Sequence, residues 1–233
     1  MDALWGFLEN AAILVGGLAV RFAVAAVLLG VLVALLLPFL YAGEGLRRTL
    51  MRLGGFGSVS GLSWRRDTYY SPAHAWLRAR AGQLRIGLDD LAGRLLRRVD
   101  RVQLPEVGAY LKEGDALLTM ETGQRGVVIP APVEGTVLRV NARLEEQPDA
   151  IVQDPYRSGW IVEIQPAGDR YRALRRNEEA RAWLAREAAR LSLALEHATG
   201  IVAADGGDLT VPTHLLITEE KRAELERQFL QTL

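Results

Sequence analysis

The chain has 233 residues, 28 basic and 28 acidic side chains, and 49% hydrophobic residues. This length fits one or two modest domains, and the zero net charge gives no overall attraction to nucleic acid or to anionic lipid. The sequence contains no cysteine, which excludes disulfides, cysteine nucleophiles, cysteine-held iron–sulfur clusters and zinc ribbons. Nearly all basic side chains are arginine, because lysine occurs only at Lys112 and Lys221.

An uninterrupted apolar segment runs from Phe22 to Ala42 and contains no charged residue. About 20 such residues allow a helix to cross the hydrocarbon core of a bilayer, so we expect a transmembrane helix over 22–42, within an N-terminal segment 1–53. A second apolar stretch, 11–20, is separated from it by Arg21 and either extends one long tilted helix or forms an interfacial helix. A cleaved signal peptide fits less well, because the basic residues follow the apolar segment.

The arginines next to this segment predict its orientation. Arg47, Arg48 and Arg52 follow it, whereas Arg21 is the one basic residue before it. The positive-inside rule therefore predicts a single-pass protein of the cytoplasmic (inner) membrane, with its C-terminal part in the cytoplasm. Residues 54–63 are rich in glycine and serine and predict a flexible tether.

Short apolar runs separated by turns indicate a β-rich domain over residues 64–166. The expected strands are at 83–88, 101–104, 116–120, 126–133, 135–140 and 159–166. One helix is expected over 91–99, with Asp89 as its N-cap.

Residues 167–233 predict a C-terminal helix–hairpin–helix extension. Apolar residues at helical spacing indicate a helix over 177–198, and the Asp-Gly-Gly-Asp sequence at 205–208 predicts a β-hairpin over 200–212. A second helix is expected after Thr218, which is placed to act as its N-cap.

Several motifs within residues 64–166 occur together in one known family. They are His74-Ala75-Trp76-Leu77, Arg85-Ile86-Gly87-Leu88, the LPEVG sequence at 104–108, the APVEGTV sequence at 131–137, and the block from Val140 to Pro166 with its Asp-Pro-Tyr and Gly-Trp elements. The domain resembles the H protein of the glycine cleavage system. The resemblance implies an α+β domain built on a flattened two-sheet β-barrel of the lipoyl-carrying type.

The sequence departs from this family at the position that carries the cofactor. In the family, a lysine at the tip of a β-hairpin holds lipoate, and the resemblance places Gln124 at that position. Neither glutamine nor the guanidinium of Arg125 offers the amine that lipoylation requires, so no cofactor is expected. Glu121, Thr122, Gln124 and Arg125 remain candidates for contact with a partner protein, and the alternative is a solvated turn without a binding role.

We expect no enzyme activity and no metal site. The three histidines, His74, His197 and His214, lie far apart in the sequence and lack metal-ligand spacing. His74 belongs to the family's His-x-Trp motif, for which a packing or hydrogen-bonding role is expected. Phosphate-binding loops, dinucleotide fingerprints and nucleophile elbows do not occur in the sequence.

The hypothesis that these observations favour is a non-catalytic accessory subunit of a cytoplasm-facing membrane complex. Its expected partners are the lipid bilayer and other subunits, with a respiratory or other redox assembly as host by analogy with the family. The alternative is a carrier that bears a different covalent modification, or a tether for a lipoylated partner. A third possibility is a scaffold in which Gly30 and Ala34 pack one span against another.

Overall fold

The computed structural model describes residues 21, 27–34, 55–123, 125–199 and 217–231, and it divides into two units, 1–54 and 55–233. In the first unit, residues 27–34 are helical, and their large apolar side chains are exposed. The described stretches include no helix with both the length and the apolar character needed to cross a bilayer. Most of the expected span over 22–42, and all of the apolar stretch 11–20, lie outside the described residues.

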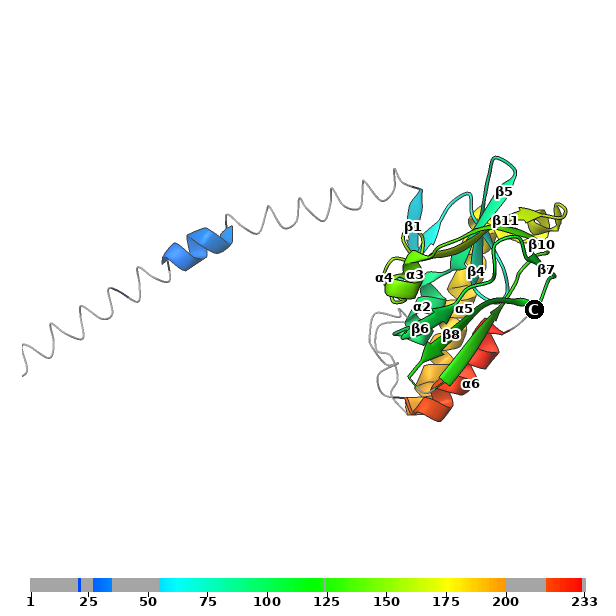
Figure 1. The fold of residues 1–233 in the computed structure, drawn as a ribbon. Helices are drawn as coiled ribbons and strands as arrows, with labels where there is room; N and C mark the ends of the chain where they lie inside the picture. Colours follow the sequence, from blue (N-terminus) through cyan, green and yellow to red (C-terminus); the bar gives the residue numbers. More distant parts are fainter. Residues whose placement is uncertain (1–20, 22–26, 35–54, 124, 200–216, 232–233) are drawn as a thin grey trace, which may run out of the picture. The chain divides into compact units, whose positions relative to one another are not determined.

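The second unit is a β-sandwich with helices packed on it (Figure 1). A seven-stranded sheet has the order β12-β3-β4-β5-β11-β10-β7, a three-stranded sheet has the order β6-β8-β9, and β1 and β2 form a separate hairpin. The strands are β1 Phe56–Val59, β2 Leu62–Arg65, β3 Tyr69–Tyr70, β4 Ala75–Arg80, β5 Gln83–Leu88, β6 Arg101–Gln103, β7 Tyr110–Leu111, β8 Ala116–Thr122, β9 Arg125–Pro130, β10 Gly135–Val140, β11 Trp160–Pro166 and β12 Arg175–Arg176. The helices are α2 Asp90–Leu96, α3 Arg143–Glu146, α4 Ala150–Gln153, the 3₁₀ turn η1 Arg170–Ala173, α5 Asn177–Thr199 and α6 Glu219–Leu230.

Alternating side chains place one face of each sheet in the core. In β8, Leu118, Met120 and Thr122 point inward and are buried, while Glu121 is exposed. The helix expected after Asp89 is confirmed as α2, and the Asp89 carboxylate caps it by accepting a hydrogen bond from the Ala92 N–H. The structure thus confirms a two-sheet fold with a helical extension.

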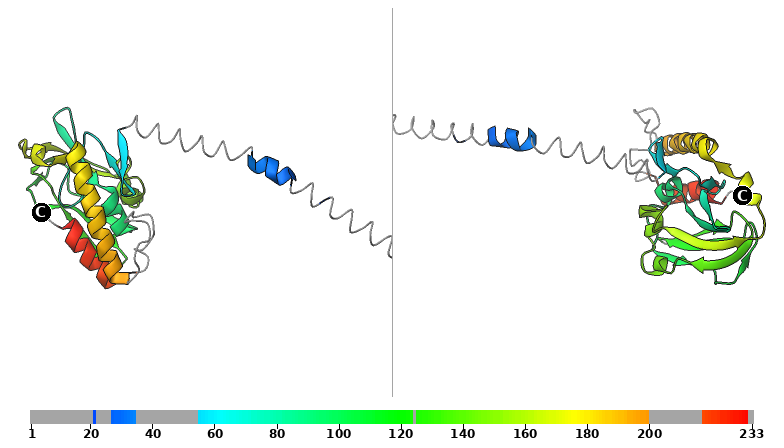
Figure 2. Two further views of the ribbon diagram at one scale, coloured as in Figure 1. Left: turned by 180° about the vertical axis from the view of Figure 1, so that it is seen from behind. Right: turned by 90° about the horizontal axis from the view of Figure 1, so that it is seen from above.

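The two expected C-terminal helices are confirmed and lie beside each other against the sandwich (Figure 2). The apolar stripe of α5 is buried, including Ala180, Trp183, Leu184, Ala188, Leu191 and Leu195. In α6, Leu225, Phe229 and Leu230 are buried, and Thr218 caps the helix by accepting from the Lys221 N–H. The hairpin expected over 200–212 lies outside the described residues.

The expected flexible tether over 54–63 needs correction. Residues 56–65 form the β1–β2 hairpin, in which Phe56 pairs with Arg65 and Val59 with Leu62. The inward side chains Leu62 and Trp64 are buried, Trp64 in one cluster with Tyr156 and Trp183. Burial of these two side chains orders a glycine- and serine-rich sequence that has little structural preference of its own.

The close packing of β4 on β5 requires glycine at position 87. An added Cβ on Gly87 would lie 2.7 Å from Cζ2 of Trp76, whose indole is fully buried. Gly87→Ala is therefore expected to lower the free energy of unfolding by about 1–3 kcal/mol, a typical cost of overpacking.

Denaturant unfolding monitored by circular dichroism measures this loss. Gly126→Ala is the matched control, because an added Cβ at Gly126 meets nothing within 4 Å. Equal stability of the two variants would contradict the packing argument.

Candidate functional site at the β8–β9 hairpin

The β8–β9 hairpin is the element that the sequence singled out. Thr122 pairs with Arg125 across its end, and Gly123 adopts a positive φ of 63° in the turn. The N–H of Gly123 donates to the Asp100 carboxylate at 2.7 Å, which ties the turn to the segment before β6. Gln124 lies outside the described residues.

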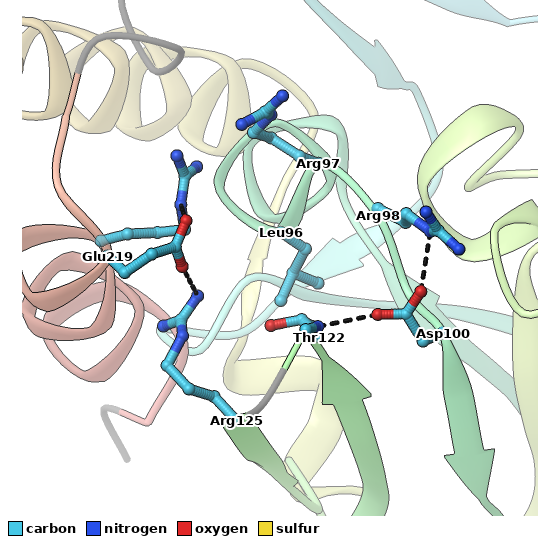
Figure 3. Close-up of a pocket in the computed structure, with 9 residues that line it drawn as sticks. Leu96, Arg97, Arg98, Asp100, Thr122, Arg125 and Glu219 are labelled. Carbon is cyan, nitrogen blue, oxygen red and sulfur yellow. Dashed lines mark hydrogen bonds and ion pairs between the residues drawn. The ribbon is translucent and has the colours of Figure 1, made fainter.

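Arg125 is held by helix α6 of the same chain. Its Nη1 lies 2.6 Å from Oε2 of Glu226 and its Nη2 lies 3.2 Å from Oε1, so the guanidinium and the carboxylate pair through two parallel bonds. A second carboxylate, that of Glu219, lies 3.1 Å from Nη2 (Figure 3). The side chain of Arg125 is 24% exposed and that of Glu226 is 4% exposed, so water screens this pair only weakly.

Burial raises the pKa of Glu226 above its usual value, although Arg125 acts in the opposite direction. The carboxylate therefore depends on the arginine to stay charged at its buried position. The prediction that Arg125 contacts a partner protein stays a prediction, and in this structure its guanidinium is already committed to α6.

The two other candidate residues face opposite directions. Thr122 is buried, and its hydroxyl has no hydrogen-bond partner among the described residues. Glu121 is exposed and lies 3.6 Å from Arg101 on the neighbouring strand β6. Of the two, Glu121 is the one available on the surface.

A pocket of about 560 Å³ lies between the hairpin, the end of α2 and the start of α6 (Figure 3). Its lining residues are Leu96, Arg97, Arg98, Asp100, Thr122, Gly123, Arg125, Glu219 and Arg222. Both acids in this lining form ion pairs with arginines, Asp100 with Arg98 and Glu219 with Arg125. The pocket lies on the side of the hairpin that α6 covers.

His74 contacts helices α5 and α6 from inside the core. It is fully buried, its Nδ1 lies 2.8 Å from the Asp89 carboxylate, and its ring stacks on Trp183 of α5 at 4.8 Å. The Glu187 carboxylate of α5 lies 3.9 Å from Nε2, and Phe229 of α6 lies 6.1 Å from the ring. His74 thus has the packing and hydrogen-bonding role that the sequence predicted.

The pKa of His74 reflects this position. Burial alone would lower it, but the Asp89 and Glu187 carboxylates outweigh burial and raise the pKa from 6.5 to about 9. Glu187 is in turn paired with Arg190 at 2.9 Å, and its own pKa is lowered: burial opposes the charge, but His74 and then Arg190 outweigh it. His74 is consequently a protonated, positively charged group at neutral pH.

Among the described residues, no group of three His, Asp or Glu side chains is placed to hold a metal ion. The contact between the hairpin and α6 was not predicted from the sequence. The signal available was the pair Glu219 and Glu226, seven residues apart and therefore on one face of a helix, but nothing in the sequence joins that face to Arg125.

Comparison with known proteins decides the family. Residues 68–187, just over half of the chain, match the sequence profile of the glycine cleavage H-protein. The chain belongs to the glycine cleavage H-protein family. This match continues into α5, beyond residue 166, the predicted end of the β-rich domain.

Two relatives compared by sequence agree with this assignment. The chain is 38% identical over 99 residues to glycine cleavage system H protein 4 of Aquifex aeolicus, covering 42% of this chain and 58% of that protein. It is 36% identical over 101 residues to the glycine cleavage system H protein of Thermus thermophilus, covering 43% and 79%. A crystal structure of an H protein from Mycobacterium marinum aligns with a TM-score of 0.43 at 29% identity, covering 46% of this chain and 90% of that chain.

Removal of the Arg125 side chain is expected to loosen α6. Arg125→Ala leaves the Glu226 carboxylate buried without its bidentate partner, which we expect to cost on the order of 2 kcal/mol. Hydrogen exchange of the α6 amides should accelerate accordingly.

Arg101→Ala serves as the matched control, because the exposed pair of Arg101 with Glu121 contributes little. Unchanged protection of α6 in Arg125→Ala would contradict the role given to this ion pair.

The raised pKa of His74 predicts a pH dependence of stability. The pKa of His74 is about 9 in the folded state and 6.5, the usual value for histidine, in the unfolded chain. Protonation of His74 therefore stabilises the fold fully below pH 6.5. The stabilisation, on the order of 3 kcal/mol, declines as pH rises and is lost above about 9.

Denaturant titrations across this pH range should show that decline in the wild type and not in His74→Gln. His197→Gln is the control, because His197 is exposed and its Nδ1 lies 2.8 Å from the Leu193 carbonyl oxygen. A wild-type stability that is flat between these pH values would refute the assignment of a charged His74.

Proposed function

We propose that this H-protein-family chain is a non-catalytic docking subunit, anchored by one transmembrane helix in the cytoplasmic membrane, of a complex that faces the cytoplasm. The observation that carries the proposal is the state of the β8–β9 hairpin. The position expected to carry lipoate is Gln124, and the next residue, Arg125, is fixed to α6 by a partly buried bidentate ion pair.

The position of the two lysines supports the loss of the lipoyl arm. Lys112 follows β7 in an exposed turn, where its N–H donates to the Asp115 carboxylate. Lys221 lies in α6, with its Nζ 2.8 Å from Glu224. Neither is in the β8–β9 hairpin, so lipoate attached to either lysine would start from a different element.

The contacts that hold the hairpin in place support the proposed docking role more than the role of a mobile carrier. A carrier has to present its cofactor to successive partners. Here Gly123 is bonded to Asp100 on one side, and Arg125 is paired with Glu226 on the other. A fixed, charged hairpin edge is suited to a single long-lived contact.

The apolar N-terminal segment supports the membrane anchor. The 21 residues from Phe22 to Ala42 contain no charge, and three arginines follow within ten residues. Among them, residues 27–34 are helical and expose Val27, Leu28 and Leu29 by more than 60%, as expected of side chains that contact lipid. A respiratory or other redox assembly is the proposed host, by analogy with the redox enzymes that H proteins serve.

A lipoylation assay tests the loss of the carrier function. Purified chain, lipoate, ATP and a lipoate ligase are incubated together, with an unmodified H protein that has the lipoyl lysine as positive control, and intact masses are measured. The wild type is expected to keep its unmodified mass, and Gln124→Lys is the variant expected to gain a lipoyl group.

A lipoylated wild type, or a different covalent mass on chain isolated from its own cells, would overturn this proposal. The second result would favour the alternative, a carrier that bears another modification.

A further inference from the structure

A second charged surface lies on the seven-stranded sheet, away from the β8–β9 hairpin. Arg78 on β4 is opposite Arg85 on β5, Arg85 is opposite Glu163 on β11, and Glu163 is opposite Arg139 on β10. These four residues form one row across four neighbouring strands, and Arg80 stands two residues beyond Arg78 on the same side. We call this surface, Arg78, Arg80, Arg85, Arg139 and Glu163, the arginine face.

The charges of the arginine face do not balance. Glu163 is shared by two arginines, with Arg85 at 2.6 Å and Arg139 at 2.8 Å, and three positive charges remain uncompensated by this carboxylate. Arginines placed directly opposite each other on neighbouring strands repel. Burial, followed by the nearby charges of Arg65 and Arg85, lowers the pKa of Arg78 to about 10.

Aromatic rings hold these arginines in place. Arg85 and Arg139 both lie over Trp160, each 4.9 Å from the ring centroid, and Arg78 lies 5.3 Å from that of Trp76. Stacking orients a guanidinium without neutralising it. The fold therefore keeps a cluster of like charges fixed at the surface, at a cost in stability.

The arginine face is hollowed. A groove of about 200 Å³ is lined by Arg78, Arg80, Ala81, Gln83, Arg85 and Glu163. The Nε of Arg78 is buried and lacks a hydrogen-bond partner among the described residues, while one of its Nη atoms donates to the Tyr156 carbonyl. Three guanidiniums around one groove have the geometry and charge to bind the phosphate of an anionic group.

The entry point of the chain indicates the source of that phosphate. The apolar segment ends at Ala42, and β1 begins at Phe56, so the intervening chain reaches at most about 45 Å when fully extended. Phe56 contacts the guanidiniums of Arg65 and Arg157, whose charges continue those of the arginine face. An anchored domain would thus keep a basic surface within reach of the lipid headgroups.

We propose that the arginine face binds the anionic headgroups of the membrane that holds the anchor, and so fixes the domain against the bilayer. This inference rests on the proposed membrane anchor. With the arginine face on the bilayer, the β8–β9 hairpin, which belongs to the other sheet, stays accessible to a protein partner.

The absence of cysteine allows a direct test with the full chain. Gln83→Cys places one thiol beside the groove, and an environment-sensitive fluorophore on it reports contact with lipid. The labelled chain is reconstituted into nanodiscs of phosphatidylcholine alone or with phosphatidylglycerol. Emission should shift to the blue with phosphatidylglycerol and return on addition of salt, which screens the charges. Val128→Cys, exposed on β9 of the other sheet, should not respond.

Charge variants then assign the effect to the groove. In the Gln83→Cys background, Arg80→Gln should reduce the ratio of bound to unbound domain about fivefold, the contribution of one basic residue near an anionic surface. Arg186→Gln, an exposed arginine on α5, should leave it unchanged.

Three results would overturn the inference. The first is an equal emission in both kinds of nanodisc, and the second is an equal reduction of the ratio of bound to unbound domain in Arg80→Gln and Arg186→Gln. The third is a full response to inorganic phosphate in phosphatidylcholine discs, which would indicate that the groove binds a soluble anion instead of lipid. Failure of the chain to enter nanodiscs at all would contradict the proposed membrane anchor. Incorporation into the nanodiscs is measured separately from the fluorescence.

Discussion

A buried charge in the core connects the sandwich to its C-terminal helices. The imidazole of His74 lies between the carboxylates of Asp89, the N-cap of α2, and Glu187 of α5, and it stacks on Trp183. A buried positive charge is tolerated only with such partners, so the positions of α2, β4 and α5 are mutually fixed. Phe229 packs near the same ring and holds α6 in position, and the ion pair of Arg125 with Glu226 depends on that position.

The consequence for the family fold is a hairpin with restricted freedom. A guanidinium in the tip region is paired with an acid that is itself buried, and separation of the two would expose α6 and leave an uncompensated charge. The proposal that Gln124 stands at the lipoyl position and the ion pair that holds its neighbour Arg125 point in the same direction. Both features underlie the proposed docking role, in which the hairpin keeps one partner instead of carrying a group between sites.

Local sequence patterns predicted the elements whose stability is local. Helical spacing in α5, the Thr218 cap of α6 and the Asp89 cap of α2 were all readable, because each depends on residues within a few positions of one another. The β1–β2 hairpin was not, since its order depends on burial of Trp64 against residues far along the chain. The same holds for the contact of Arg125 with Glu226, which joins residues 101 positions apart.

The most direct test of the central claim is isolation of the tagged full chain from its own membranes in a mild detergent, with mass spectrometry of the chain and of everything bound to it. The account predicts that the chain is recovered from the membrane fraction with its unmodified mass, together with a reproducible set of other subunits. A chain recovered alone from the soluble fraction, or one that carries an additional covalent group, would contradict it.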